Sequence, residues 1–416
     1  MDTAIVMYGP PAAGKDTVTA ALAELGKEFR HYQRMKVGVG RTTGYRMASP
    51  ADLEELVAAG EVIYSNSRYG SIYIIDRPEL TRIFAAGEIP VLHVGQPEAI
   101  NALLAACPGV RWVVVELWCP RNVAASRAAA RGTGDTAERL AVWDATPRLT
   151  IADIRIDTAA VNPTDAAHQI VKAVHAARCA IVVPAMHLLH PDGTLDLGAT
   201  RRHATAAAAS WIDFFLINGS TTAGDELTSA EREAVLDVWL EAVDNSRVLA
   251  CAWSAEDLAT AAERHVTPMA VLRAATRPVA EQFLRTLPGG SLIYSHPMFG
   301  YAFDAKLAAW AKSAGHLPAG GKLAKIQLTE ITELRRAAPE FATWDGSSRR
   351  IRESVGAGAA GVVATPLAAV LTDLPPRSLA QVQPAIDIVQ DKLDQLQERA
   401  AKREWLQHRI RAGQET

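Results

Sequence analysis

Over residues 1–178, short apolar runs alternate with stretches in which apolar residues recur at helical spacing. Such an alternation of strands and helices predicts a parallel sheet that is covered by helices. The runs typical of strands lie at residues 3–9, 89–95 and 111–118. The stretches typical of helices lie at residues 15–26, 49–60, 77–87, 122–132 and 168–178. We therefore expect a first α/β domain over residues 1–178.

A second series of strand-like runs begins after Arg178, and most of these runs are followed by a helical stretch. Eight such units predict a closed (β/α)8 TIM barrel over residues 179–372. The remaining residues, 373–416, predict a C-terminal extension formed by one long amphipathic helix. This helix would pack on the barrel, form an oligomer contact or simply be solvated. The strand-like runs lie at residues 181–186, 214–219, 248–253, 266–273, 291–297, 320–326, 341–346 and 361–366.

The composition indicates which partners and which cellular compartment to expect for this protein. The 416 residues carry a net charge of -3, so no basic field attracts nucleic acid or an anionic membrane. No apolar run approaches the ~20 residues that span a bilayer, and the run at residues 3–9 is too short for a leader. The 4 cysteines lie far apart, unlike those of a zinc site or a disulfide framework. We expect a cytoplasmic protein that acts on small molecules, with a homo-oligomer through the barrel or the C-terminal helix left open.

The stretch "GPPAAGKDT" lies between the first predicted strand and the first predicted helix, the setting of a Walker A loop. Gly9 and Gly14 let the backbone turn its N–H groups toward phosphate oxygens, and the helix adds its N-terminal dipole. Lys15 would reach the terminal phosphates of ATP. Asp16 stands where a hydroxyl usually orders Mg²⁺, so either Asp16 or Thr17 would hold the ion. A plain glycine–proline turn is the alternative. The predicted ATP-binding residues are Gly9, Pro10, Pro11, Ala12, Ala13, Gly14, Lys15, Asp16 and Thr17.

Three arginines further along the chain point to phosphoryl transfer. Arg127 and Arg131 lie one turn apart on a predicted helix, and Arg139 follows a polar glycine–threonine loop. Arginines on such a helix–loop–helix can close over a transferring phosphoryl group and neutralise its charge. The alternative is a basic helix face in contact with solvent.

Residues 3–178 resemble the guanylate kinase family. The phosphate loop, "RTTGYR", "SRYGS" and "ARGTGDTAERL" occur in the order found in that family. The resemblance implies a P-loop kinase that transfers the γ-phosphoryl group of ATP·Mg²⁺ to a small acceptor. The catalytic residues that it implies are Lys15, Arg127, Arg131 and Arg139. The residues that it places against the phosphate of the acceptor are Arg46, Tyr69 and Ser71.

Other positions depart from the guanylate kinase pattern. Tyr64 lies near the place of an acid that reads guanine in that family, and His93 and Gln96 replace the acids at the end of a strand. A pocket without carboxylates cannot pair with the N1–H and amino groups of guanine. The "GKD" form of the loop is similar to that of ribose 1,5-bisphosphate phosphokinases. We therefore expect a small phosphorylated acceptor, a nucleotide or a sugar phosphate, with GMP disfavoured.

Residues 180–370 resemble the dihydrodipicolinate synthase and N-acetylneuraminate lyase family. "GSTTAGDELTSAE" follows the second strand, "SLIYSHP" is similar to "ILYNVP" of that family, and "GGKLAKI" is similar to the region of its Schiff-base lysine. The resemblance implies a lysine that attacks a 2-keto acid without an organic cofactor, a tyrosine that relays protons and a loop that binds the carboxylate. The implied residues are Lys322, with Lys325 as a rival, Tyr294, Ser220 and Thr221.

The barrel half also departs from its family. The segment "TPMAVLRAATRP" lacks a second tyrosine, and Met298 and Phe299 occupy a stretch where an arginine often binds a carboxylate. Asp225 or Glu226 replaces an acid only approximately. A barrel that has lost its chemistry is the alternative. His187, His190 and His296 lie near strand ends but lack the spacing of metal ligands, so we expect no metal there.

Three functions remain open on the sequence alone. The first is a phosphotransferase fused to a Schiff-base aldolase or lyase. The second is a keto-acid lyase or synthase with a regulatory nucleotide-binding domain. The third is a non-catalytic fusion in which the C-terminal helix mediates assembly. Lys15, kept together with the three arginines, favours the first function over the second, because a regulatory domain could dispense with the arginines.

Overall fold

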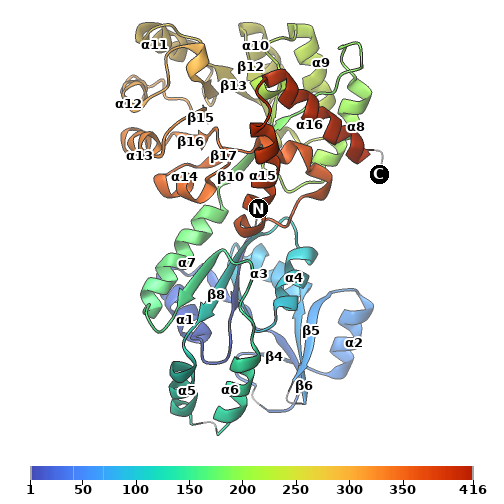
Figure 1. The fold of residues 1–416 in the computed structure, drawn as a ribbon, viewed down its shortest axis with the longest axis vertical. Helices are drawn as coiled ribbons and strands as arrows, with labels where there is room; N and C mark the ends of the chain where they lie inside the picture. The colour runs from blue at the N-terminus through green and yellow to red at the C-terminus, as the bar shows by residue number, and fades with distance from the viewer. Residues whose placement is uncertain (1, 41, 69, 133, 415–416) are drawn as a thin grey trace. The chain divides into compact units, whose positions relative to one another are not determined.

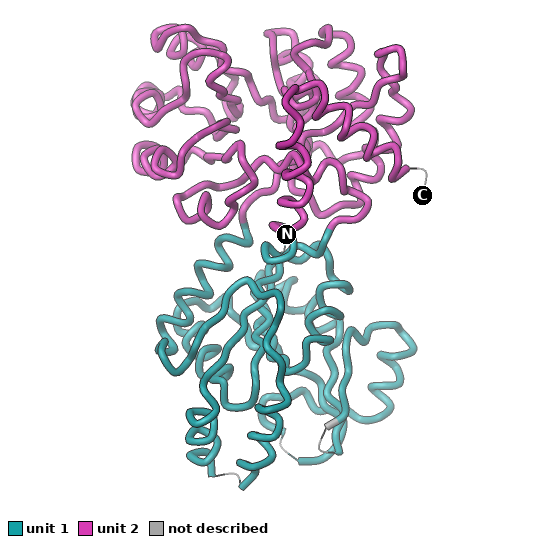
Figure 2. Tube along the Cα trace, viewed as in Figure 1, with its two compact units in different colours: residues 1–178, 375–382 teal, residues 179–374, 383–416 magenta. Residues whose placement is uncertain are grey.

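The structure is a computed structural model that describes residues 2–40, 42–68, 70–132 and 134–414. It divides into two compact units (Figure 2). Unit 1 consists of residues 1–178 and 375–382, and unit 2 of residues 179–374 and 383–416. The chain passes from unit 1 to unit 2 after Arg178, where the sequence predicts the end of the first domain. The residues after 372, expected to form a separate extension, are divided between the two units.

A five-stranded parallel sheet forms the centre of unit 1 (Figure 1). Every residue of β1 is buried, as expected for a parallel strand that is covered on both faces. The three strands expected from the sequence are present, and two further strands lie at the edges of the sheet. In spatial order the strands are β2 (Phe29–His31), β7 (Ile89–Val94), β1 (Thr3–Tyr8), β8 (Arg111–Trp118) and β9 (Ile154–Asp157).

The two faces of this sheet support two separate cores. Ile5 and Met7 of β1 pack with apolar residues of α1 and α7, whereas Val6 and Tyr8 pack with those of α3 and α4. Alternate residues of a strand point to opposite faces, so one short apolar run serves both cores. The helices of unit 1 are α1 (Lys15–Leu25), α2 (Pro50–Ala58), α3 (Arg77–Ala85), α4 (Pro97–Ala106), α5 (Arg121–Ala130), α6 (Thr136–Ala145) and α7 (Pro163–Ala177).

A second, four-stranded sheet in unit 1 was not expected from the sequence. Its strands are mostly short and carry many polar residues, so their hydrophobic pattern is weak. One of its strand pairs is parallel and two are antiparallel. In spatial order the strands are β4 (Arg46–Ala48), β3 (Met35–Gly38), β6 (Ser71–Asp76) and β5 (Val62–Arg68).

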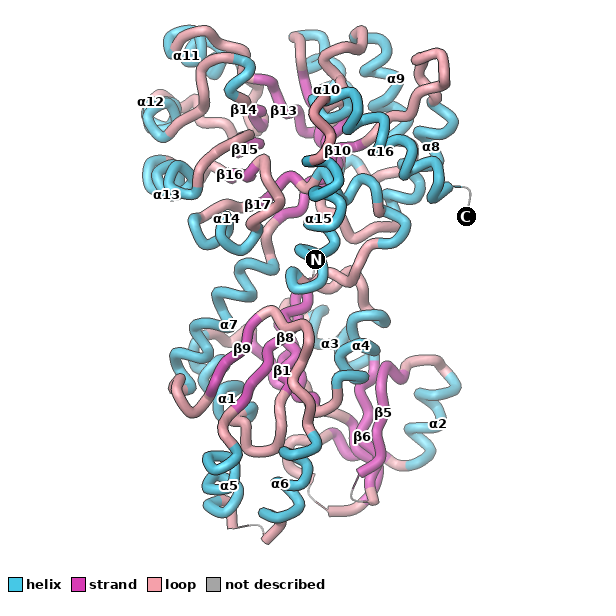
Figure 3. Tube along the Cα trace, in the orientation of Figure 1, coloured by secondary structure: helices cyan, strands magenta, loops and turns pink. Residues whose placement is uncertain are grey.

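Unit 2 is built on a closed barrel of parallel strands that follow one another in sequence order, drawn in magenta in Figure 3. The first strand, β10, pairs with the last strand, β17, and this pairing closes the barrel. The barrel predicted for this part of the chain is thereby confirmed. The strands are β10 (Ala180–Ala185), β11 (Phe214–Ile217), β12 (Val248–Ala252), β13 (Thr267–Val271), β14 (Leu292–Ser295), β15 (Gly320–Leu323), β16 (Ala342–Asp345) and β17 (Gly361–Val363).

Helices surround the barrel because a parallel strand can be joined to the next only by a crossover connection. Polar caps start several of them. Ser254 and Asp257, for example, form a capping box at the start of α10. The helices between the strands are α8 (Leu197–Ala208), α9 (Ser229–Leu240), α10 (Ala255–Glu263), α11 (Arg277–Thr286), α12 (Ala305–Ser313), α13 (Leu328–Ala337) and α14 (Ile351–Ala357).

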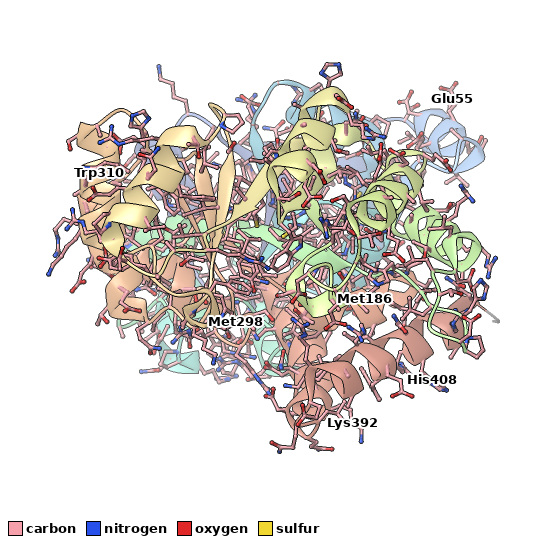
Figure 4. The ribbon with its side chains drawn as sticks, turned by 90° about the horizontal axis from the view of Figure 1, so that it is seen from above. Glu55, Met186, Met298, Trp310, Lys392 and His408 are labelled. Atoms are coloured by element: carbon pink, nitrogen blue, oxygen red, sulfur yellow. The ribbon has the colours of Figure 1, made fainter. Side chains whose placement is uncertain are left out.

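The C-terminal residues form two helices, so the prediction of one long helix is wrong. α15 (Leu379–Asp394) ends before α16 (Arg399–Gln414) begins, although neither glycine nor proline lies between them. Contacts of α16 with the barrel explain the break. Arg399 at its start pairs with Asp225, and Leu406 is fully buried. His408, labelled in Figure 4, lies on the exposed side of the helix. The contacts of α16 with the barrel therefore determine where this helix begins, although the hydrophobic pattern alone predicts one continuous helix.

The helices of the two units are of moderate length. The longest that are described, α15 and α16, have 16 residues each. Within the described part of the chain, no helix has the length and apolar character required to cross a membrane.

Candidate active sites

The loop between β1 and α1 wraps closely against strand β8. A Cβ atom at Gly9 would lie 2.2 Å from the carbonyl oxygen of Leu117, so only glycine fits there. Gly14 has a φ of 91°, a left-handed conformation that glycine adopts without strain, and α1 begins at the next residue. The loop lines one side of a cavity of about 500 Å³. The geometry therefore agrees with a loop that surrounds an anion.

Lys15 folds back over this loop. Its Nζ atom donates hydrogen bonds to the carbonyl oxygens of Gly9, at 2.6 Å, and Pro10, at 3.0 Å. Burial lowers the pKa of Lys15 to about 8, while the nearby carboxylate of Asp16 opposes the shift. The amine is therefore still mostly charged at neutral pH, and the two carbonyl groups hold it at the cavity.

Asp16 lies between two groups from distant parts of the chain. Its carboxylate is 3.4 Å from Nδ1 of His93 on β7 and 3.7 Å from a guanidinium nitrogen of Arg131. The hydrogen bond with His93 holds the pKa of Asp16 well below its usual range. Burial lowers the pKa of His93 to about 4, so its ring is neutral at pH 7. Nε2 of His93 lies 2.7 Å from Oγ1 of Thr19. Thr17, the other predicted ion ligand, is exposed and does not line the cavity.

The three predicted arginines occupy two kinds of position. Arg131 and Arg139 line the cavity. Arg127 instead donates to the carbonyl oxygens of Ala12, at 3.2 Å, and Thr158, at 2.7 Å. Arg127 therefore braces the backbone of the loop, and its role is to position the loop.

Arg46 and Ser71, two of the three predicted acceptor residues, do not line the cavity. Arg46 forms an ion pair with Asp76, and Oγ of Ser71 donates to the carbonyl oxygen of Val39. Tyr69, the third of them, lies outside the described residues. The guanidinium of Arg46 is already paired with Asp76 within the small sheet, and an acceptor site at Arg46 and Ser71 stays a prediction.

Other residues of the small sheet and its neighbouring segments line the cavity. Lys36 is only 2% exposed. Its Nζ atom donates to Val39 at 2.7 Å and lies 5.6 Å from the ring centroids of both Tyr45 and Tyr73. Lys36 was not expected at a site, although a lysine between the apolar residues of a short run was the available sequence signal. The lining residues from this part include Arg34, Lys36, Tyr45, Asn66 and Tyr73.

In unit 2, Lys322 and Tyr294 lie opposite each other on the neighbouring strands β15 and β14. Nζ of Lys322 is 4.4 Å from the centre of the Tyr294 ring, and Oη of Tyr294 is 2.7 Å from Oγ of Ser220. Lys322 is 6% exposed and Tyr294 is 1% exposed. The structure thus brings together three residues that the sequence predicted, toward the carboxyl ends of their strands, where barrel active sites are built.

Lys325, the rival of Lys322, lies beyond the end of β15 with a φ of 62° and is exposed. Lys322 instead points into the barrel. Among the described residues, no carboxylate forms an ion pair with Lys322, so no such pair has to break before its nitrogen reacts. Burial raises the pKa of the neighbouring Cys251 thiol to about 12, so this thiol is neutral. Of the two lysines, Lys322 is therefore the one that lies buried beside Tyr294.

The loop that follows β11 contains Ser220 and Thr221 in a single 3₁₀ turn. A Cβ atom at Gly224 would lie 1.9 Å from the carbonyl oxygen of Asn218, so the loop can close only with glycine at this position. The N–H group of Gly224 donates to Gly219 at 3.1 Å and closes the turn. Ser220 and Thr221 are half-buried, so their side chains are accessible in part.

Helix α16 holds this loop through ion pairs. Arg399 lies 3.2 Å from the carboxylate of Asp225 and also pairs with Glu226. Further along the helix, Gln407 donates to the carbonyl oxygen of His187 at 3.1 Å. Asp225 and Glu226, the approximate counterparts of an acid of the family, are therefore engaged by α16. These contacts could not be predicted from the sequence, because they join residues more than 170 positions apart.

The histidines near the strand ends have separate environments. Burial lowers the pKa of His187 to about 4. His190 lies 3.8 Å from Asp196, and His296 accepts a hydrogen bond from the N–H of Met298 at 3.0 Å. Among the described residues, no three or more acidic, histidine or cysteine side chains form a group that could hold a metal ion.

Comparisons with known proteins add a likeness of fold for part of the chain. No protein-family model and no curated protein matches it. A putative dihydrodipicolinate synthase family protein from Coccidioides immitis is 22% identical, with a TM-score of 0.43 over 56% of this chain and 76% of its own. Dihydrodipicolinate synthase from Agrobacterium tumefaciens is 18% identical, with a TM-score of 0.46 over 54% of this chain and 85% of its own.

A third solved structure, the 2-keto-3-deoxygluconate aldolase from Picrophilus torridus, is 19% identical, with a TM-score of 0.47 over 56% of this chain and 93% of its own. These similarities are too distant to support an argument about the activity of this chain. None of the three structures is a kinase, so the resemblance of unit 1 to guanylate kinases has no support from them and stays a prediction.

Proposed function

We propose that unit 2 is a lyase or synthase that forms a Schiff base between Lys322 and a 2-keto acid. One observation carries the proposal. The amine of Lys322 lies against the ring of Tyr294, and the hydroxyl of Tyr294 is 2.7 Å from Ser220. A buried amine, a proton relay and a polar loop are the groups that this chemistry requires.

The reaction would begin when the neutral amine of Lys322 attacks the keto carbon. A C–N bond forms, and the carbonyl oxygen takes a proton. Loss of this oxygen as water leaves a protonated imine. The imine accepts the electron pair released at the carbon next to it as an enamine, so that the C–C bond on the far side of that neighbouring carbon can break or form. Tyr294 is placed to move protons to and from the substrate oxygen, and Ser220 can pass them on. The hydroxyls of Ser220 and Thr221 would bind the carboxylate.

Reduction with borohydride in the presence of pyruvate tests this proposal. We expect mass spectrometry to find one reduced pyruvyl group on the peptide that contains Lys322. Lys322→Ala should abolish the adduct, whereas Lys325→Ala, the matched control, should retain it. An adduct that persists in Lys322→Ala would show that another amine reacts.

A second candidate function belongs to unit 1, namely the transfer of a phosphoryl group from ATP to a small phosphorylated acceptor. The observation that favours it is a cavity in which five cationic side chains outnumber three carboxylates. The cations are Lys15, Arg34, Lys36, Arg131 and Arg139, and the carboxylates are Asp16, Asp135 and Glu138. Such a concentration of cations suits two phosphate-bearing ligands, because phosphoryl transfer depends on positioning and charge neutralisation.

The residues of unit 1 fit an Mg²⁺ ion that arrives with the nucleotide. Asp16 is an ionised carboxylate that lines the cavity, whereas Thr17 does not. When bound, the ion would neutralise charge on the phosphate oxygens. His93 and Arg131 hold the carboxylate of Asp16 beside the loop, and Lys15 supplies a fixed positive charge there. Arg131 and Arg139 would then bind the transferring group.

The acceptor can be identified by the consumption of ATP·Mg²⁺ with a panel of small phosphates. The described lining residues from the small sheet and its neighbours include no carboxylate, so we expect sugar phosphates to be better acceptors than GMP. A strong preference for GMP would contradict this expectation. If ATP binds without turnover but changes the yield of the Lys322 adduct, unit 1 is regulatory instead.

A further inference from the structure

A series of aromatic rings leads from the candidate nucleophile of unit 2 to an arginine. The Tyr294 ring, which contacts Lys322, lies 5.6 Å from the ring of Phe299. Phe299 lies 5.6 Å from the ring of Trp253, and both ring pairs are edge-to-face. The guanidinium carbon of Arg273 is 5.0 Å from the Trp253 ring and 5.7 Å from the Phe299 ring.

These residues all lie on the side of the barrel where its strands end. Trp253 directly follows β12, Arg273 follows β13 by two residues, and Phe299 lies in the turn after β14. The indole N–H of Trp253 donates to the carbonyl oxygen of Asn218 at 2.8 Å, which fixes the ring. Met298, labelled in Figure 4, precedes Phe299 and is 60% exposed. Substrates of barrel enzymes enter at this face.

Arg273 differs from its neighbour Arg277 in its partners. Arg277 forms an ion pair with Glu281 at 2.8 Å. Arg273 is exposed, and across the described ranges it contacts the two rings but no carboxylate. Stacking on aromatic rings occupies the faces of a guanidinium and leaves its N–H edges available. Those edges match the oxygens of a carboxylate or a phosphate.

We propose that Arg273 forms an anion subsite for a second acidic group of the 2-keto acid that is held on Lys322. The inference rests on the Schiff-base function proposed above. Because Phe299 lies between Arg273 and Tyr294, this group must be several bonds away from the keto carbon. The substrate class is therefore a longer 2-keto acid that ends in a carboxylate or a phosphate, with its chain along the aromatic rings.

The concentration of keto acid that gives half-maximal adduct on Lys322 tests this subsite. The probes are pyruvate, 2-oxohexanoate, 2-oxoadipate and 6-phosphooxy-2-oxohexanoate, which share the reacting group and differ at the distal end. For the preferred anion we expect the half-saturating concentration to be about tenfold lower than for 2-oxohexanoate, as for a hydrogen bond to a charged group. The comparison of 2-oxoadipate with the phosphate ester shows which anion Arg273 binds.

Arg273→Gln should remove the advantage of the anionic probes and leave the value for pyruvate unchanged. Arg277→Gln, the matched control, should retain the advantage. An advantage that survives in Arg273→Gln, or no advantage in the unmodified protein while pyruvate still reacts, overturns the subsite alone. The absence of any adduct with every probe overturns the Schiff-base function and the subsite with it.

Discussion

The two candidate sites hold positive charge in opposite ways. In unit 1, Lys15, Arg131 and Lys36 line one cavity, and each has polar or aromatic partners that keep the charge in place. In unit 2, Lys322 is buried beside Tyr294 and forms no ion pair with a carboxylate of the described residues. The cavity of unit 1 therefore contains several positively charged side chains, whereas the candidate site of unit 2 contains one buried amine.

This difference follows from the reactions proposed for the two units. Phosphates keep their negative charge throughout the transfer, so a site for them needs several permanent cations. Attack on a carbonyl group needs one amine that can lose its proton, and further cations or carboxylates beside it would change its charge state. The two arrangements of charge therefore agree with the two different reactions proposed. Each variant below changes a residue of one of the two units.

The largest effect is expected when the lysine of either site is removed. Lys322→Ala should abolish adduct formation, because the bond-forming atom is gone, and should leave ATP turnover unchanged. Lys15→Ala should lower ATP turnover by roughly 10²–10³-fold, the usual loss when one group that stabilises charge is removed, and should leave the adduct unchanged. Both reactions are measured on both variants. Loss of both reactions in one variant, with its fold retained by circular dichroism, would contradict two independent chemistries.

A smaller effect is expected for Tyr294→Phe. The phenyl ring keeps the contact with Lys322 and with Phe299, but the hydroxyl that lies 2.7 Å from Ser220 is lost. Removal of a proton relay should slow imine formation by about 10²-fold while the final yield of adduct at long times is unchanged. The measurement is the rate of trapping by borohydride quench. Ser295→Ala, next to Tyr294 on the same strand, is the control, and equal rates in Tyr294→Phe and the unmodified protein would exclude the relay.

The barrel was predictable from the sequence because its strands are short apolar runs with clear boundaries. All eight runs, from residues 181–186 to residues 361–366, coincide with strands of the barrel. The small sheet of unit 1 was not predictable in this way. Its strand β3 places a lysine, Lys36, at a buried position, where the amine donates to Val39 and lies beside the rings of Tyr45 and Tyr73.

In the candidate sites, too, only features with a local sequence signal could be predicted. Local motifs were enough to select Lys15, which lines the cavity of unit 1, and Lys322, which lies buried beside Tyr294, whereas the roles of both lysines stay predictions. The positions of Arg46 and Arg127 could not be predicted, since their partners Asp76 and Thr158 lie 30 and 31 residues away. The break before α16 has the same cause, because it depends on the contact between Arg399 and Asp225.

A modest effect is expected for Arg399→Ala. Without this side chain, Asp225 and Glu226 lose their main partner on α16, and the loop that contains Ser220 should become less ordered. We expect the half-saturating concentration of pyruvate to rise by about fivefold, which corresponds to ~1 kcal/mol, with the maximal yield of adduct unchanged. Arg409→Ala, an exposed residue of the same helix, is the control. A fall in maximal yield instead would mean that α16 contributes to the chemistry itself.

The last effect concerns stability and not activity, at a histidine that unit 2 keeps uncharged by burial alone. His203 packs edge-to-face on Trp239 at 5.6 Å, and burial lowers its pKa from 6.5 to about 4, without the carboxylate that accompanies His93 in unit 1. Since the unfolded chain binds this proton more readily, the contribution to stability is complete above pH 6.5 and is lost as the pH falls toward 4, by up to ~3 kcal/mol.

His203→Phe keeps a ring against Trp239 but cannot take up a proton. We therefore expect the free energy of unfolding of unit 2 to fall less steeply between pH 6.5 and 4, by about one proton. Urea unfolding followed by hydrogen exchange of the barrel amides measures this slope, and His408→Phe on the exposed side of α16 should leave it unchanged. An identical slope in His203→Phe would mean that His203 is already accessible to protons in the folded protein. In that case burial alone would not keep the imidazole of His203 uncharged.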